Sequence, residues 1–324
     1  MNEIFNSMKD LFKAINNYGY ITDDSLVLSL YLAYNLNKPV LLQGPPGVGK
    51  TEIAKVISQL MNNCDPIRLQ CFEGIDASQA IYDWDYKKQL LYIEHCKGKI
   101  SWDDIEVDLY SDNFLIARPL LKSILSERKE VILLDELDKS DEEFEAFLLE
   151  FLGEMQISIS ESKTLKAKNT PLCFITSNNQ RQLSDALLRR CVYFYIDYPS
   201  LERELEIIHT KVPNVDDLLA TQVVKFVQLL RQENLKKIPS ISETIDWVQA
   251  LVKLEAKSLS PKLVKNTLNL ILKTKSDLDT IDSKINVLFD KVPKKAIKID
   301  KENLQNNKIK QIDNILDNDN NWNF

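Results

Sequence analysis

Apolar residues near the N-terminus recur at helical spacing, which predicts an amphipathic first helix. Its apolar positions are Phe5, Met8, Leu11, Phe12 and Ile15. Gly19 ends that segment, and Asp23 and Asp24 stand where N-caps are expected for a second helix from Leu26 to about Asn35. The chain is therefore expected to begin with two helices.

Five short runs farther along the chain are apolar on both faces, as buried parallel strands are. They are Val40–Gln43, Ile67–Cys71, Val131–Leu134, Leu172–Thr176 and Val192–Ile196. Because helical stretches separate most of these runs, the pattern predicts repeated β-α units and an α/β fold with a parallel sheet and flanking helices.

The pattern changes after Tyr198-Pro199, where helical spacing extends from Leu201 to about Ile281 with a break at Lys236–Ser240. From about Lys291 the sequence is rich in Lys, Asn and Asp, and its apolar residues are isolated. We therefore expect an α/β core over residues 1–198, a small all-α lid domain over 199–285, and a weakly structured tail over 286–324.

Composition and charge narrow the class of protein. The 324 residues are 44% hydrophobic and 27% charged, which is ordinary for a soluble globular protein. The apolar runs are too short to span a bilayer, and the N-terminus lacks the layout of a secretory signal, so we expect a cytoplasmic protein with no membrane span. The net charge of −7 provides no overall attraction to nucleic acid.

The cysteines indicate neither a disulfide framework nor a zinc site. Their number, five, is odd, and no CxxC pair occurs among Cys64, Cys71, Cys96, Cys173 and Cys191. His95 and Cys96 are adjacent, but with only two histidines in the chain we interpret them as structural residues.

The strongest motif follows the first predicted strand and begins a helix. It is a complete GxxxxGK[ST] phosphate loop: Gly44, Pro45, Pro46, Gly47, Val48, Gly49, Lys50 and Thr51. Three of the seven glycines in the chain lie here, where they let backbone N–H groups converge on a polyphosphate. Lys50 is expected to contact the β and γ phosphates, Thr51 to bind Mg²⁺, and Glu52 to begin the helix beside the nucleotide.

Two carboxylates follow the third predicted strand. Because ligands bind at the carboxyl ends of parallel strands, Asp135 and Glu136 are expected beside the phosphate loop. Asp135 is the candidate for holding Mg²⁺, and Glu136 for polarising the attacking water. The alternative is that they only cap the next helix, Ser140–Phe151. We interpret Asp141, Glu142 and Glu143 as structural acids of that helix's first turn.

These motifs together resemble those of AAA+ ATPases, and most closely the MoxR-type branch, over roughly residues 15–285. The stretches that carry the resemblance are Lys38–Leu42 before the phosphate loop, Arg68–Gly74, Tyr82–Tyr86, Phe144–Glu150, Thr176–Asn178, Asp185–Cys191 and Pro239–Trp247.

The resemblance implies roles for further residues. Asn178 matches the first sensor near the γ-phosphate, with a turn after a strand as the alternative. Arg190 matches an arginine finger that reaches a neighbouring subunit, and Arg189 is a second candidate cation, although both could instead bind terminal carbonyls of a helix. Tyr20 and Ile21 are expected to frame the adenine.

The resemblance also implies a hexameric ring, a protein client to be remodelled or matured, and a von Willebrand factor A partner. The segment Ile75–Ser101 corresponds to the insertion of MoxR-type proteins, and a hairpin at Gln156–Asn169 is a second candidate for contacting a client. One residue departs from the pattern of many AAA+ proteins, because Ser242 stands where they place a second-sensor arginine. Either Lys237 or another base substitutes for it, or the lid responds to the nucleotide in a different way.

Other classes of function stay open. A nucleic-acid motor or loader is disfavoured by the acidic balance, and a scaffold without turnover by the intact Lys50, Asp135, Glu136 and Arg190. The sensor and finger residues and the long helical second domain disfavour a small-molecule kinase. No Asn-Lys-x-Asp motif follows the catalytic strand, which favours ATP over GTP.

Overall fold

The computed structural model describes residues 3–96, 109, 111–160 and 163–297. The chain divides into two compact units. The sheet unit comprises residues 32–43 and 57–194, and the lid unit comprises residues 1–31, 44–56 and 195–324.

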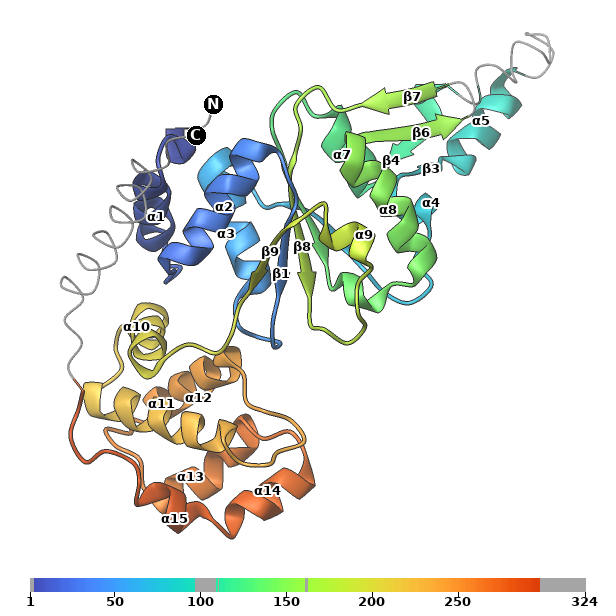
Figure 1. The fold of residues 1–324 in the computed structure, drawn as a ribbon. Helices are drawn as coiled ribbons and strands as arrows, with labels where there is room; N and C mark the ends of the chain where they lie inside the picture. The colour runs from blue at the N-terminus through green and yellow to red at the C-terminus, as the bar shows by residue number, and fades with distance from the viewer. Residues whose placement is uncertain (1–2, 97–108, 110, 161–162, 298–324) are drawn as a thin grey trace. The chain divides into compact units, whose positions relative to one another are not determined.

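A five-stranded sheet forms the centre of the sheet unit, and its strands lie in the order β2-β5-β8-β1-β9. Figure 1 labels β1, β8 and β9 of this sheet. The strands are β1 (Val40–Gln43), β2 (Ile67–Gln70), β5 (Val131–Asp135), β8 (Leu172–Ser177) and β9 (Val192–Tyr195). The pairs β2–β5, β5–β8 and β1–β8 are parallel. The predicted strands and the α/β class are therefore confirmed, with strand ends that differ by at most one residue.

Both faces of the sheet are buried at its three central strands, β5, β8 and β1, which explains why these strands are mostly apolar, whereas the edge strands β2 and β9 alternate with more exposed side chains. One face packs against α7 (Pro119–Leu125) and α8 (Glu142–Glu154) through Ile132, Leu134, Cys173 and Ile175. The opposite face contributes Val131, Leu133 and Phe174, which are fully buried. Asp141, which we expected within the first turn of this helix, is instead its N-cap, and its side chain accepts a hydrogen bond from Phe144 N–H at 2.8 Å.

Smaller elements surround this core. Strands β3 (Tyr82–Trp84) and β4 (Leu115–Ala117) form one antiparallel pair, and β6 (Gln156–Ser160) and β7 (Lys163–Lys166) form the predicted hairpin. The expected insertion at Ile75–Ser101 contains α4 (Ala77–Ala80), β3 and α5 (Tyr86–Cys96), and its last residues lie outside the described part of the chain. The turn η3 (Leu137–Lys139) and α9 (Asp185–Leu188) follow β5 and β8.

The N-terminal helices contribute to the lid unit. The predicted apolar residues lie in η1 (Glu3–Phe5) and α1 (Met8–Asn17), and they are buried, as Leu11 and Ile15 illustrate. Helix α2 (Asp24–Leu36) is capped by Asp23, which accepts a hydrogen bond from Leu26 N–H at 2.8 Å. Helix α3 (Lys50–Asn62) follows the phosphate loop.

The C-terminal part of the lid unit is helical, as the sequence predicts. Its helices are α10 (Leu201–Lys211), α11 (Asp217–Arg231), α12 (Ile241–Lys253), α13 (Pro261–Thr267), α14 (Lys275–Asp282) and α15 (Ile285–Phe289), with the short turn η4 (Leu268–Leu270). Trp247 is fully buried in their core, where its Nε1–H donates to Thr267 Oγ1 at 2.9 Å. The core continues to the buried Val292, past residue 285 where the helical domain was expected to end.

Among the described residues, no helix combines the length and the apolar character that crossing a bilayer requires.

Replacing Leu133 on the central strand β5 by Ala should lower the free energy of unfolding by about 3 kcal/mol, because a fully buried side chain leaves a cavity. The control is Leu90→Ala on α5, whose side chain is 64% exposed. Urea titration followed by circular dichroism measures both. Equal effects of the two substitutions would contradict the position of β5 in the buried sheet.

Candidate functional site

The phosphate loop lies in the lid unit, and other segments of that unit press directly on its glycines. A Cβ on Gly44 would lie 2.0 Å from the carbonyl oxygen of Ile196, and a Cβ on Gly47 would lie 2.6 Å from the Cβ of Ser240. Both glycines also have positive φ, at +155° and +71°. These two positions therefore exclude every larger residue on steric grounds, and Gly47 on conformational grounds as well.

Lys50 is the first residue of α3 and is almost fully buried. Its ammonium group donates to the carbonyl oxygens of Gly44 and Pro45, both at 2.7 Å. The side chain of Lys50 thus folds back toward the start of the phosphate loop, and its ammonium group lies beside the carbonyl groups of Gly44 and Pro45. This is the position from which an ammonium group contacts a bound polyphosphate.

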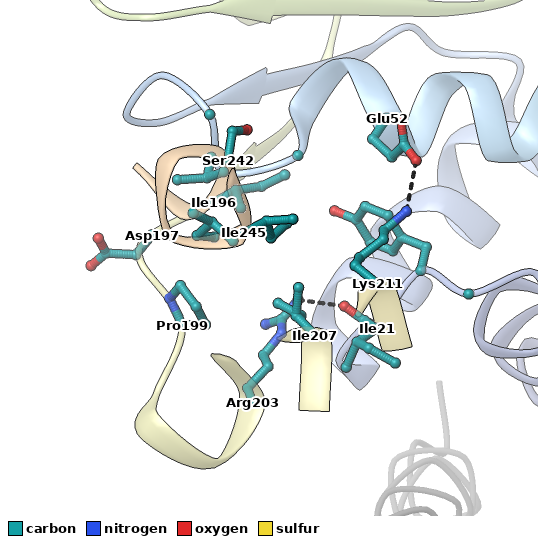
Figure 2. Close-up of a pocket in the computed structure, with 16 residues that line it drawn as sticks. Ile21, Glu52, Ile196, Asp197, Pro199, Arg203, Ile207, Lys211, Ser242 and Ile245 are labelled. Carbon is teal, nitrogen blue, oxygen red and sulfur yellow. Dashed lines mark hydrogen bonds and ion pairs between the residues drawn. The ribbon is translucent and has the colours of Figure 1, made fainter. Parts of the chain in front are cut away.

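A cavity of about 260 Å³ opens beside the loop, entirely within the lid unit (Figure 2). The sequence-predicted residues that line it are Tyr20, Ile21, Gly47, Val48, Gly49 and Glu52. The ring of Tyr20 packs against Gly49, since a Cβ there would lie 3.3 Å from Tyr20 Cε2. Burial raises the pKa of Tyr20 above its ordinary value, so the hydroxyl stays neutral at physiological pH.

Sequence reasoning missed the rest of the cavity wall. Its apolar residues are Ile196, Pro199, Ile207, Ile241 and Ile245, and its charged residues are Asp197, Arg203 and Lys211. The available signals were the Tyr-Pro step after the last strand and the Ser-x-x-Glu pattern at Ser240, which forms a capping box at the start of α12. The apolar surface suits the flat face of a nucleobase.

Two basic side chains of α10 border the cavity. Arg203 forms an ion pair with Asp23 at 2.5 Å and donates to the carbonyl oxygen of Ile21 at 3.1 Å. Burial acts to raise the pKa of Asp23, but Arg203 and the hydrogen bond from Leu26 N–H outweigh it and lower the pKa. Lys211 lies 3.1 Å from Glu52, and because both side chains are partly exposed this pair contributes little to stability.

The second-sensor position also lies at this cavity. Ser242 lines it, whereas Lys237, one of the candidates to substitute for an arginine, is not among the lining residues. The Lys237 side chain is exposed, and its backbone N–H donates to Asp277 at 3.2 Å. The bases that line the cavity are Arg203 and Lys211.

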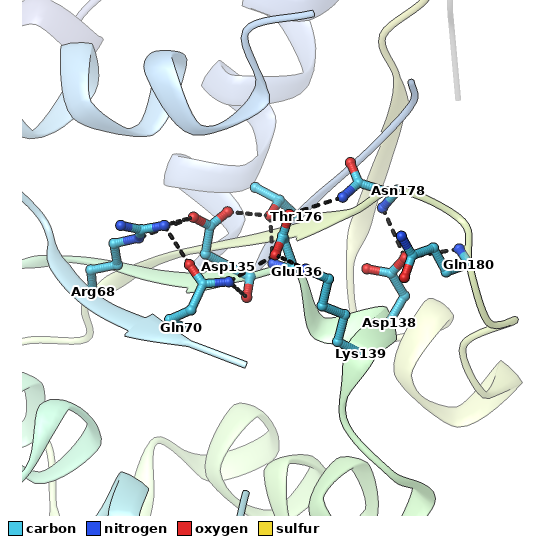
Figure 3. Close-up of polar contacts among 9 residues, drawn as sticks. All are labelled: Arg68, Gln70, Asp135, Glu136, Asp138, Lys139, Thr176, Asn178 and Gln180. Carbon is cyan, nitrogen blue, oxygen red and sulfur yellow. Dashed lines mark hydrogen bonds and ion pairs between the residues drawn. The ribbon is translucent and has the colours of Figure 1, made fainter. Parts of the chain in front are cut away.

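The two candidate carboxylates lie in the sheet unit, at the end of β5 (Figure 3). Asp135 is buried, and one of its oxygens accepts a hydrogen bond from Thr176 Oγ1 at 2.6 Å. The other oxygen accepts from Arg68 Nε at 3.0 Å. Arg68 also forms an ion pair with this second oxygen through Nη2 at 2.5 Å, so both oxygens are engaged and Asp135 fits a Mg²⁺ site only through the water shell of the ion, as the sequence predicts.

Glu136 is held from three sides. Its Oε1 accepts from Asn178 Nδ2 at 3.1 Å, and its Oε2 accepts from Gln70 Nε2 at 2.9 Å and lies 2.6 Å from Lys139 Nζ. The hydrogen bond and charge of Glu136 raise the pKa of Lys139. The backbone at Glu136 is left-handed, with φ 58°. The predicted sensor amide therefore lies directly against the predicted water-activating carboxylate.

Asp138 is a further functional candidate that sequence reasoning missed. Its Oδ2 accepts from the backbone N–H groups of Asn178 at 3.0 Å and Gln180 at 2.8 Å. This carboxylate thereby fixes the turn that presents the Asn178 side chain. Its spacing of three residues after Asp135 was the available signal.

The same carboxylates act on a neighbouring thiol. Burial, together with the charges of Asp135, Asp138 and Glu136, raises the pKa of Cys71 to about 12, so this thiol is protonated at neutral pH.

The two candidate finger arginines lie at the end of α9. Arg189 is the C-cap residue of that helix, and both side chains are exposed. Arg190 Nη1 donates to the carbonyl oxygen of Ala186 at 2.9 Å, which is the helix-end contact considered as the alternative. The α9 segment is itself anchored by the buried Glu145, which accepts from Ser184 N–H at 2.7 Å and pairs with Arg181 at 2.8 Å.

Comparison with known proteins gives the family of the sheet region. Residues 39–191 match the model of the AAA domain of the dynein-related subfamily. An uncharacterized protein of Staphylococcus haemolyticus is 24% identical over 74% of this chain and 85% of its own length. The chaperone ClpB of Malacoplasma penetrans is 25% identical over 54% of this chain, but the match spans only 22% of ClpB.

The structure of RuvB from Thermotoga maritima is 18% identical and covers 76% of this chain and 67% of its own, with a TM-score of 0.44. The assignment rests on the family match, which includes the phosphate loop, both carboxylates and the sensor and finger candidates. Residues 39–191 are therefore similar to the AAA domain of the dynein-related subfamily, and the chain is an ATPase.

Proposed function

We propose that this ATPase is a cytoplasmic, Mg²⁺-dependent, ring-forming machine of the MoxR branch. It uses the energy of ATP hydrolysis to remodel or mature a protein client, and it acts together with a von Willebrand factor A partner. The observation that carries the catalytic part is the contact of Asn178 Nδ2 with Glu136 Oε1 at 3.1 Å, beside the buried Asp135. A sensor amide, a base and a metal-binding acid at neighbouring strand ends form the set that NTP hydrolysis requires.

In the proposed mechanism the lid unit binds the nucleotide. The adenine lies in the apolar cavity between Tyr20 and Ile245, and the phosphates lie along the loop, where N–H groups and Lys50 neutralise their charge. Thr51 and Asp135 would hold Mg²⁺, which supplies neutralisation of the charge that develops on the phosphate oxygens. The proposal requires the phosphate loop and the carboxylates to act on the same triphosphate.

Glu136 orients and polarises the attacking water in this mechanism, and Asn178 fixes the position of both. The guanidinium group of Arg190 from a neighbouring subunit stabilises the negative charge that develops on the phosphate oxygens in the transition state. The exposure of Arg190 supports this role, because a finger must reach beyond its own subunit. An arginine supplied in trans requires a head-to-tail interface, and such interfaces close into rings; we propose a hexamer.

Glu136→Gln should lower the ATP hydrolysis rate at least about 100-fold while nucleotide binding is kept, since the amide cannot accept the proton from water. Phosphate release gives the rate, and isothermal titration with ATP gives the affinity. The control is Glu142→Gln, an exposed acid in the first turn of α8 that should leave both unchanged. An unchanged rate in Glu136→Gln would refute catalysis at this carboxylate.

Arg190→Ala and Lys50→Ala should each abolish most hydrolysis, yet a mixture of the two variants should regain activity. In mixed rings a Lys50→Ala subunit supplies the arginine that the intact site of its Arg190→Ala neighbour needs. Phosphate release as a function of mixing ratio measures the recovery. Arg189→Ala serves as the comparison for the second cation. A mixture no more active than its components would count against an arginine acting in trans.

The Glu136→Gln variant should also retain its partner in ATP and lose it in ADP, because a blocked ATP state prolongs the client-bound conformation. Affinity purification followed by mass spectrometry identifies the retained protein, which is expected to carry a von Willebrand factor A domain. Hydrolysis by the unmodified protein that rises with added DNA or RNA, and no such partner, would favour the nucleic-acid motor instead.

A further inference from the structure

One buried arginine connects α11 to two stretches of the lid unit, residues 198–204 and 239–244. Arg231, at the end of α11, forms a two-pronged ion pair with Glu204 of α10, with both N–O distances at 2.7 Å. The Glu204 side chain is completely buried, and that of Arg231 is 8% exposed. A guanidinium group is suited to such a site because its planar fork keeps several donors in fixed directions.

The same guanidinium group contacts the two segments that lead into α12 and into α10. Its Nε donates to the carbonyl oxygen of Pro239 at 2.9 Å, and its Nη2 donates to Thr244 Oγ1 at 3.2 Å. Its central carbon lies 4.6 Å from the centroid of the Tyr198 ring. Arg231 therefore fixes α10, α12, the loop before α12 and the segment after β9 relative to one another.

Each partner of Arg231 adjoins a residue of the cavity wall. Glu204 follows Arg203, Thr244 precedes Ile245, and Tyr198 lies between Asp197 and Pro199.

The fourth partner, Pro239, precedes Ser240, whose side chain presses on the phosphate loop at Gly47. Arg231 itself is not among the residues that line the cavity. It lies behind the wall and contacts the segments from which that wall is built.

Net stability does not by itself account for this arrangement. Burying two charges costs solvation energy that their attraction only roughly offsets, so an apolar pair of similar volume would stabilise the lid core about as well. An apolar pair cannot fix the neighbouring segments in one direction, because it has no donors for Pro239 and Thr244. The specific consequence of the ion pair is therefore the position of the cavity wall.

We propose that Arg231 is a positioning residue of the nucleotide site. It holds the part of the cavity wall that comes from α10, α12 and the segment after β9, and it keeps the start of α12 against the phosphate loop. This inference rests on the proposed role of the cavity in binding the nucleotide. It also suits the serine at position 242, since the arginine that organises this lid lies behind the wall rather than at the tip of α12. Arg231 thereby sets nucleotide affinity, while the carboxylates of the sheet unit set the rate of hydrolysis.

Arg231→Lys keeps the charge but loses the two-pronged fork, so it should weaken ADP binding about 10-fold, measured by isothermal titration calorimetry. KM for ATP should rise in parallel, while kcat at saturating ATP should stay within about twofold. The control is Lys265→Met, which removes a 2.7 Å ion pair with Asp282 elsewhere in the lid helices and should leave ADP affinity unchanged.

A second variant, Arg231→Met combined with Glu204→Met, distinguishes a loss of nucleotide affinity that comes from a displaced cavity wall from one that comes from unfolding of the lid. It leaves no unpaired buried charge, so the lid should stay folded in thermal melts without nucleotide. ADP affinity should still fall about 10-fold. A folded double variant that binds ADP as the unmodified protein does would overturn the proposal.

Failure of the underlying function gives a different result. If Lys50→Ala leaves ADP binding unchanged, the phosphate loop is not the binding site and the proposed function falls. If Lys50→Ala abolishes ADP binding but both Arg231 variants bind ADP normally, only the positioning role falls.

Discussion

The backbone at the end of β5, where both candidate carboxylates lie, depends on one hydroxyl group. Thr176, on the central strand β8, donates to Asp135 at 2.6 Å and accepts from the backbone N–H of Glu136 at 2.8 Å. The parallel pairing of β5 with β8 brings this hydroxyl to both carboxylate residues at once. Glu136 has a left-handed backbone that a non-glycine residue adopts only at a cost, and the hydrogen bond to Thr176 helps to hold it there. Strand register thus brings Thr176 to both residues, while Arg68 also holds the Asp135 carboxylate, and Gln70, Lys139 and Asn178 hold the carboxylate of Glu136.

The phosphate loop depends on a different constraint, which is the close approach of three segments far apart in the sequence. Ile196 approaches Gly44, Ser240 approaches Gly47 and Tyr20 approaches Gly49. The loop's glycines therefore do two things: they expose N–H groups to a polyphosphate and they admit the walls of the adjoining cavity. A chain with only seven glycines places three of them here because side chains at Gly44 and Gly47 would collide with those walls.

The sequence predicts the elements well because buried parallel strands and capped helices leave local signals. Val131–Asp135 is recognisable from its own residues, and so is the acidic N-terminus of α8. The contact between Gln70 and Glu136 is different, since it depends on the register of β2 against β5, which one sequence does not reveal.

The cavity wall was missed for a related reason. Residues such as Ile207 and Ile245 follow the spacing of core positions, and only the folded lid unit shows that they line a cavity. Lys237 was considered as a substitute base from its position in the sequence alone, but its side chain is exposed and bases of α10 line the cavity instead.

The contacts of Glu136 also indicate which of its oxygens serves the water in the proposed mechanism. A carboxylate oxygen accepts about two hydrogen bonds, and Oε2 already receives Gln70 and Lys139. Oε1 receives Asn178 alone among the contacts described, so it keeps a lone pair for a water molecule. That water would lie within reach of the same Asn178 amide, whose position is fixed in turn by Asp138 through the backbone N–H of residue 178. The sensor and the base therefore act as one unit, and a change in the turn that Asp138 holds would move both the carboxylate oxygen and the amide that directs the water to it.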